Sequence, residues 1–307
     1  MLKQSLLYLS TAAWAQNIAT NWSVAKRVAR RFVAGETMDD AIAVTHTLNN
    51  KGIEVTLDFL GESVTSESDS EAVITTYLQL LDRINSEQLK SSVSIKLTHI
   101  GYDISEDLAV HNLRKILQRA KAYAIKITID MESTVYTDAT IRIYRTMRDE
   151  YDFDNVGTVI QAYLRRTEAD IKALASEGSR IRLCKGAYLE APELAFPEKA
   201  AVDANYVKMA DLFLDADNGN GYLEFATHDE SMIQSALNII EKQNISAEKY
   251  EFQMLYGVRS DRQQELADAG HKMRVYVPFG ESWYPYFVRR LAERPANLWF
   301  FMKSLFR

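Results

Sequence analysis

Apolar residues along this chain gather in short runs rich in valine, isoleucine and threonine, and longer segments with helical spacing lie between the runs. Short β-branched runs bounded by glycine are typical of strands, whereas apolar residues recurring every three or four positions predict helices. Helices are expected near residues 71–85 and 111–123, among others. The eight predicted strands are residues 52–61, 92–101, 125–132, 158–164, 180–186, 222–228, 250–255 and 273–280.

The predicted strands are mostly continuous apolar runs, which indicates burial on both faces, as in a parallel sheet covered by helices. An open, doubly wound sheet usually has fewer than eight strands, so the alternation favours an α/β fold of the closed (β/α)8, TIM-like type. All five prolines lie from Pro192 onward. Residues 190–205, which contain Pro192 and Pro197, are expected to form a long loop after the fifth strand, on the face where barrel enzymes build their sites.

The first fifty residues have a different texture, and we expect residues 1–50 to form an N-terminal helical segment before a catalytic barrel of residues 51–307. Apolar positions recur at helical spacing from Leu6 to Trp22, and two helices with Gly35 between them are expected from 23 to 50. The first sixteen residues also resemble a secretory signal, but Ser10 and Thr11 interrupt their apolar stretch. We therefore favour an amphipathic helix and a cytoplasmic protein.

Composition narrows the classes of partner. With 36 basic and 42 acidic residues, the 307-residue chain carries a formal charge of −6, which provides no general attraction for nucleic acid or anionic lipid. A single cysteine, Cys184, excludes an intrachain disulfide and a cysteine-based zinc site. The five histidines show no metal-binding spacing, and the phosphate-loop, zinc-protease and serine-hydrolase motifs are absent. No metal is therefore expected.

Charged and polar residues inside the apolar strands are the best candidates for chemistry, because burying an unpaired charge is costly. Each of them taken singly has an ordinary interpretation as a strand-end residue that reaches solvent. Taken together they converge on the carboxyl-terminal face of the predicted barrel, which indicates a site. These residues are Lys96, Asp130, Gln161, Arg182, Lys185, His228 and Gln253.

The last predicted helix carries two adjacent arginines, Arg289 and Arg290, with Glu293 three to four residues further on. One carboxylate at this spacing can brace both guanidiniums on a helix face. The group could be a solvated ion pair on an outer helix. It could equally grip a small carboxylate ligand, since paired guanidiniums suit bidentate binding.

Four segments give the sequence a resemblance to the monofunctional bacterial proline dehydrogenases: RLCKGAYLE (182–190), FATHDE (225–230), YEFQMLYGVR (250–259) and RVYVPFGESWYPYFVRRLAERPAN (274–297). The resemblance implies an FAD-dependent barrel that oxidises L-proline to 1-pyrroline-5-carboxylate, by hydride transfer from proline C5 to flavin N5. It further implies electron transfer to a membrane quinone and functional coupling to a 1-pyrroline-5-carboxylate dehydrogenase.

The same resemblance implies roles for individual residues. Arg289, Arg290 and Lys96 would hold the proline carboxylate, and Glu293 would orient the arginines. The pocket walls would be Leu255, Tyr276, Tyr188 and Tyr286, with Asp130 fixing Arg289 or Tyr276 beside them. The residues that resemble the FAD-binding positions are Asp130, Met131, Gln161, Arg182, Lys185, Gly186, Ala187, Thr227, His228 and Glu293. Lys96, Arg182, Lys185, Arg289 and Arg290 would give this site a local excess of buried positive charge.

The sequence departs from the family at two positions and leaves other questions open. Leu189 stands where the family often has a tryptophan near the adenine, and Cys184 stands for a common valine as a buried strand residue. A flavoenzyme for hydroxyproline or another cyclic amine and a non-enzymatic binding module are the alternatives. We expect the aromatic tail at 298–307 to pack on the barrel wall, the alternative being peripheral membrane contact.

Overall fold

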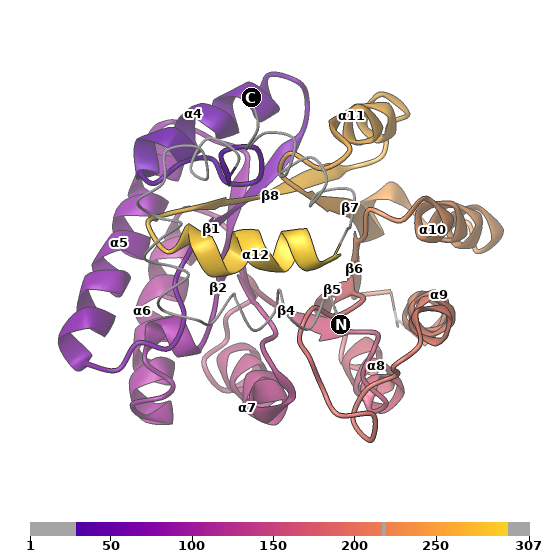
Figure 1. Cartoon of the computed structure of the whole chain (residues 1–307), viewed down its shortest axis with the longest axis horizontal. Coiled ribbons are helices and arrows are strands. Elements are labelled where there is room, and N and C mark those ends of the chain that lie inside the picture. The colour runs from indigo at the N-terminus through magenta and orange to yellow at the C-terminus, as the bar shows by residue number, and fades with distance from the viewer. Residues whose placement is uncertain (1–28, 217–218, 294–307) are drawn as a thin grey trace.

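The computed structural model describes residues 29–216 and 219–293, which form a closed barrel of eight parallel strands (Figure 1). Each strand pairs with its neighbours in chain order, and β1 pairs with β8 to close the barrel. The strands are β1 (Glu54–Phe59), β2 (Ser91–Ile95), β3 (Ile127–Ile129), β4 (Val156–Gln161), β5 (Arg180–Cys184), β6 (Tyr222–Ala226), β7 (Tyr250–Leu255) and β8 (Met273–Phe279). The predicted (β/α)8 fold and all eight predicted strands are confirmed.

Helices follow the strands and surround the barrel, as the spacing of apolar residues predicts (Figure 1). Side-chain caps begin several of them: the Ser66 and Ser105 hydroxyls accept from backbone N–H groups in the first turns of α5 and α6. The surrounding helices are α5 (Glu67–Ser86), α6 (Glu106–Ala122), α7 (Thr134–Arg145), α8 (Thr167–Ser176), α9 (Lys199–Ala216), α10 (Glu230–Lys242) and α11 (Ser260–Asp268).

Two further helices depart from a simple ring. The helix α4 (Met38–Asn49) precedes β1 and packs outside β1 and β8, where it buries Ala41 and Ile42 in the main core. The last helix, α12 (Trp283–Glu293), lies across the end of the barrel instead of beside β8 (Figure 1). Its apolar face packs on Leu60 and Val258, which follow β1 and β7, so α12 covers the carboxyl-terminal face. This arrangement brings α12 over the predicted site.

The two faces of the strands differ in a way that the prediction of continuous apolar runs missed. Outward-facing residues are apolar and bury the main core against the helices, as expected for a parallel barrel. The alternate, inward-facing positions carry hydroxyls and charges. Among them are Thr56, Asp58, Ser92, Ser94, Lys96, Thr128, Asp130, Arg182, Glu224, Glu251, Gln253, Arg274 and Tyr276, nearly all of them buried. Burial on both faces is therefore confirmed, but the barrel interior is polar.

Two details were predicted wrongly. The loop expected over 190–205 ends earlier, because α9 begins at Lys199, so only residues 185–198 connect β5 to α9. Cys184, expected to be buried, is only partly buried, since it is the last residue of β5. The helix expected between Leu6 and Trp22, and the aromatic tail at 298–307, lie outside the described residues. In the described ranges, no helix is long and apolar enough to cross a membrane.

Candidate active site

Asp130, directly after β3, lies at the centre of the polar cluster at the carboxyl-terminal end of the barrel. One carboxylate oxygen accepts from Arg182 Nη1 at 2.7 Å, and the other accepts from the Tyr276 hydroxyl at 2.6 Å. The Lys96 ammonium lies 3.9 Å from the second oxygen. Three elements far apart in sequence thus meet on one buried carboxylate. Asp130 was expected to fix either Arg289 or Tyr276, and its contact with Tyr276 is present.

Lys96 has a second acidic neighbour that the sequence interpretation missed. Its Nζ donates to both carboxylate oxygens of Asp58, at 3.2 and 3.4 Å. Burial would lower the pKa of the ammonium, but Asp58 and Asp130 raise it above its ordinary value, so Lys96 is charged. Asp58 could have been found in the sequence, because it is an acidic residue at an inward position of the apolar run 52–61.

The Arg182 guanidinium is fixed by partners from other strands. Its Nε donates to Gln253 Oε1 at 2.6 Å, while Nη1 donates to Ser94 Oγ at 3.0 Å as well as to Asp130. Gln253 Nε2 in turn donates to carboxylates of Glu224 and Glu251, both at 2.6 Å. This second layer orients the guanidinium from below, and its two glutamates were not predicted.

The expected excess of positive charge is not present in the barrel interior. Buried acids pair with the cations, because a buried charge without a partner would strongly destabilise the folded protein. The buried cations of the interior are Lys96, Arg182 and Arg274, and the buried acids are Asp58, Asp130, Glu224 and Glu251. Of these acids the sequence indicated only Asp130, and Asp58, Glu224 and Glu251 were not predicted.

On α12, Tyr286 packs in one apolar cluster with Leu255 and Tyr276 from β7 and β8, as expected for the walls of a pocket. The guanidinium carbon of Arg290 lies 5.1 Å from the centre of the Tyr286 ring, within range of a cation–π contact. Arg290 and three of the four predicted wall residues thereby lie close together at the barrel end.

Arg289 has an acidic partner that was not predicted. Arg289 Nη2 donates to Glu62, three residues after β1, at 2.7 Å. Burial would raise the pKa of Glu62, but Arg289 and Lys96 hold it below its ordinary value, so this carboxylate is ionised. Glu293 is the last residue of α12, and its side chain lies outside the described part of the structure.

Two residues of the expected flavin site present buried polar atoms that have no hydrogen-bond partner within the described chain. They are Oε1 of Gln161, an acceptor, and Nη2 of Arg182, a donor. Both residues are inward-facing on the adjacent strands β4 and β5. Buried polar groups are nearly always paired, so these two atoms point to a polar ligand of the site. A flavin ring offers the donors and acceptors that would satisfy them, so these residues fit the cofactor.

The other residues of the expected flavin site follow β5 and β6. Lys185 forms ion pairs with Asp203 and with Asp229, the latter at 2.8 Å. The Thr227 hydroxyl accepts from the Asp229 backbone, and His228 Nε2 accepts from the Leu255 backbone at 2.8 Å. These contacts bind the loop after β5 to the loop after β6, and the loop after β6 to β7.

Gly186 has a positive φ of 114°, and a Cβ there would lie 2.1 Å from the Tyr163 ring. Only glycine therefore fits this turn. Ala187 continues the turn, and Met131, the residue after Asp130, is buried. Leu189 is 66% exposed, so this residue is not packed against the described part of the chain.

Tyr188 lies in the loop after β5, within electrostatic reach of Glu62, Lys96 and Arg289. Burial and the charge of Glu62 raise the pKa of its hydroxyl, whereas Arg289 and Lys96 oppose the shift. The side chain is thus close enough to feel the charges of the proposed carboxylate-binding residues. It remains neutral at physiological pH.

Two ionisable residues near Lys96 were missed altogether. Glu132 accepts from the Thr98 backbone at 3.2 Å and from the Thr98 hydroxyl at 2.7 Å, and burial raises its pKa to about 7. His99 is buried next to Gly61, and burial together with Lys96 lowers its pKa to about 3. The histidine is therefore neutral at physiological pH, and the glutamate is partly protonated.

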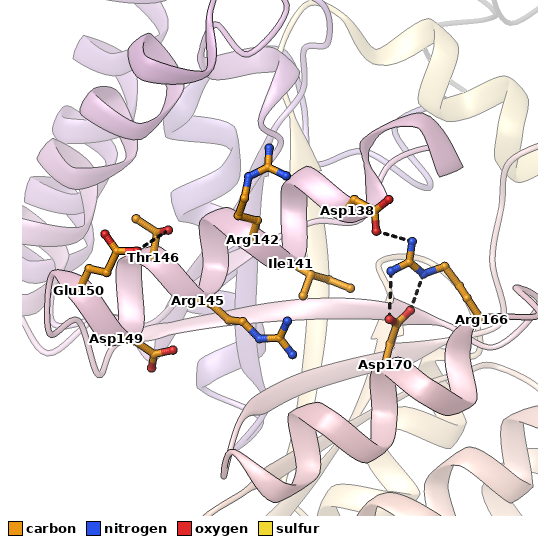
Figure 2. A pocket seen from close by; sticks show the side chains of 9 residues that line it. All are labelled: Asp138, Ile141, Arg142, Arg145, Thr146, Asp149, Glu150, Arg166 and Asp170. Carbon is orange, nitrogen blue, oxygen red and sulfur yellow. Dashed lines mark hydrogen bonds and ion pairs between the residues drawn. The ribbon is translucent and has the colours of Figure 1, made fainter.

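A separate pocket of about 290 Å³ lies on the outer surface between α7 and α8 (Figure 2). Arg166 pairs there with Asp138 and Asp170, at 2.5 and 2.7 Å, while Arg142 and Arg145 pair with glutamates of neighbouring elements. Its guanidiniums are paired with carboxylates, and none of the predicted site residues lines this pocket.

The barrel has a charged interior, two arginines over its carboxyl-terminal end (Figure 1) and buried polar atoms there that lack a partner in the described chain. These features are typical of (β/α)8 barrel enzymes, which build their sites at this face. Comparison with known proteins is more specific. The family model described as proline dehydrogenase matches residues 41–303. The chain belongs to the proline dehydrogenase family.

Individual relatives agree with this assignment. Proline dehydrogenase 1 of Bacillus subtilis (strain 168) is 41% identical over 307 residues, which cover 100% of both chains. The proline dehydrogenase of Deinococcus radiodurans is 39% identical over 283 residues, covering 91% of this chain and 90% of that protein. The crystal structure of proline utilization A (PutA) from Bdellovibrio bacteriovorus inactivated by N-propargylglycine matches with a TM-score of 0.82 at 28% identity. The match covers 91% of this chain and 34% of that one.

Proposed function

We propose that this protein oxidises L-proline to 1-pyrroline-5-carboxylate with FAD as cofactor, which is the first step of proline catabolism. The observation that carries the proposal is the cluster of Asp130, Arg182 and Tyr276 at the end of a family-typical barrel, which combines fixed charges with Nη2 of Arg182, a buried donor that has no partner in the described chain. Bound flavin would supply the chemistry by accepting a hydride from C5 of the substrate ring.

The substrate carboxylate would bind between Lys96 and the two arginines of α12. Lys96 is charged and held by Asp58 and Asp130, so its ammonium is preorganised rather than mobile. Arg289 and Arg290 would approach from above, and Arg289 is already oriented by Glu62. Three cations around one carboxylate would fix the direction of the pyrrolidine ring.

The ring itself would lie against apolar and aromatic side chains. Leu255, Tyr276 and Tyr286 share one cluster at the barrel end, and Tyr188 would close the site from the loop after β5. The Tyr276 hydroxyl donates to Asp130, and burial with the charge of Asp130 raises its pKa, so this hydroxyl stays neutral. These walls would exclude water from the carbon that loses its hydride.

Gln161 and Arg182 would contact the flavin ring, and Met131, Lys185, Gly186, Ala187, Thr227 and His228 would line the remainder of the cofactor site. A guanidinium beside the flavin favours the reduced, anionic form electrostatically. Arg182 is suited to this role because Asp130 and Glu224 raise its pKa against the effect of burial, which keeps it charged. The adenine end would meet Leu189 in place of an aromatic side chain.

Electrons would pass from the reduced protein to a membrane quinone, and the product would go to a 1-pyrroline-5-carboxylate dehydrogenase. The bifunctional protein PutA of Escherichia coli (strain K12), 28% identical over 308 residues, is covered over only 23% of its length. A second enzyme acting on the product is consistent with that larger relative. We propose a cytoplasmic protein that reaches the membrane at most peripherally.

The test is an anaerobic absorption spectrum of the purified protein before and after addition of L-proline. We expect a flavin spectrum that bleaches with L-proline, and only weakly with 4-hydroxyproline, because one ring hydroxyl changes binding by about 1–3 kcal/mol. A colourless protein that cannot be reconstituted with FAD would contradict the proposal. Stronger bleaching by 4-hydroxyproline would instead favour the alternative substrate, and Arg290→Met with full activity would favour a binding module.

A further inference from the structure

Glu190 makes an unusual contact from the loop that joins β5 to α9. Its Oε1 accepts from the backbone N–H of Thr134 at 2.8 Å, and its Oε2 accepts from the Thr134 hydroxyl at 2.6 Å. The two residues are 56 positions apart. Both oxygens of one carboxylate therefore bind a single residue at the start of α7.

The start of α7 needs such a partner. Ser133, at the position before the helix, makes no capping hydrogen bond with its side chain, and the first turn of α7 contains no acidic residue. The first backbone N–H groups of a helix have no partner within the helix, and its positive dipole end favours a negative charge. Glu190 supplies both the acceptor and the charge from a different loop.

The contact matters because of the residues next to it. Residues 194–196 of this loop are bound to the segment after β4: Arg165 N donates to Leu194 O at 2.9 Å, and Phe196 N donates to Tyr163 O at 2.8 Å. Within the described chain, in contrast, residues 186–191 make no backbone–backbone hydrogen bond outside their own loop. The two bonds of the Glu190 carboxylate fasten this stretch, which contains Tyr188, to α7.

We infer that Glu190 is a positioning residue: by capping α7 it holds the 186–191 segment, and with it Tyr188, closed over the substrate. The inference rests on the proposed function for the identity of the substrate. If the contact is lost, the segment samples open arrangements, and the apparent affinity falls in proportion to the closed fraction. Turnover of the bound substrate, in which the segment is closed again, changes little.

The experiment compares Glu190→Ala and Glu190→Gln with the control Glu193→Ala. Glu193 lies in the same loop, is exposed, and has no hydrogen bond or ion pair in the described structure. We expect Glu190→Ala to raise KM for L-proline about tenfold, or ~1.4 kcal/mol, with kcat within twofold. Glu190→Gln retains an acceptor for the Thr134 N–H and should recover part of the loss, whereas Glu193→Ala should match the unmodified protein.

A second measurement separates this inference from the proposed function. Limited proteolysis of the flavin-loaded protein without substrate should cut Glu190→Ala within residues 186–191 faster than Glu193→Ala. If the unmodified protein does not oxidise L-proline, the proposed function fails, and proteolysis alone judges the positioning role. Equal cleavage of the two variants overturns the inference, as does a Glu190→Ala variant that has lower thermal stability but an unchanged KM.

Discussion

The protonation state of Glu132 gives a prediction whose size follows from the structure. The residue is 5% exposed, and both carboxyl oxygens accept from Thr98, two residues after the proposed substrate-binding Lys96. Burial raises its pKa from an ordinary 4.5 to about 7 in the folded protein. Between these values the folded chain holds a proton that the unfolded chain releases.

The sign of the effect follows from this difference in bound protons. The contribution of Glu132 to stability is fully present below about pH 4.5 and is lost as pH rises through 7, because ionisation then occurs in a buried site. The difference between a pKa of 4.5 and one of about 7 corresponds to about 3 kcal/mol of stability, most of which is lost between pH 5 and pH 8.

The perturbation is Glu132→Gln, which keeps the shape and hydrogen-bonding capacity of the side chain and removes its titration. We expect the difference in unfolding free energy between variant and unmodified protein to move by about 2 to 3 kcal/mol in favour of the variant from pH 5 to pH 8. Urea unfolding followed by circular dichroism at both pH values measures it. Glu193→Gln, at an exposed carboxylate, should show no such change.

A difference in unfolding free energy that is the same at pH 5 and pH 8 would refute this reasoning. It would mean that Glu132 is ionised in the folded protein at both pH values, and that its contacts with Thr98 compensate for burial. A change of the opposite sign would mean that the folded protein stabilises the carboxylate.

Three other predictions concern the site. Asp130→Asn removes the carboxylate that binds Arg182 and Tyr276, and breaking such a buried pair costs ~3 kcal/mol. Steady-state kinetics should therefore show kcat/KM for L-proline falling at least about 100-fold, and a loss below threefold would argue against this role. Glu62→Gln leaves Arg289 without its ionised partner and should raise KM roughly fivefold, with an unchanged KM counting against preorganisation. The neutral state of His99, whose pKa of about 3 lies below the unfolded 6.5, contributes stability above pH 6.5 that is lost as pH falls toward 3. The thermal midpoint of His99→Gln should therefore decline less between pH 7 and pH 5 than that of the unmodified protein, and equal declines would contradict a buried neutral histidine.

The amino-acid sequence by itself determined the architecture of the barrel. Strand positions follow from local β-branched runs and glycines, and the alternation with helices leaves few topologies, so all eight strands could be located from the chain alone. The resemblance to the family also indicated the residues that gather at the carboxyl-terminal end. Both inferences depend on signals that are local in the chain.

Only the tertiary structure decided which charges meet. Glu62, not predicted, binds Arg289, and Glu190 caps α7 from a loop 56 residues away. Such pairs have no fixed sequence spacing, because closing the barrel sets the distance between strand ends, while the chain between them can have any length. The acid Glu224 shows the same limit: a glutamate in a strand is ordinary in sequence, and its buried contact with Gln253 exists only once β6 and β7 have paired.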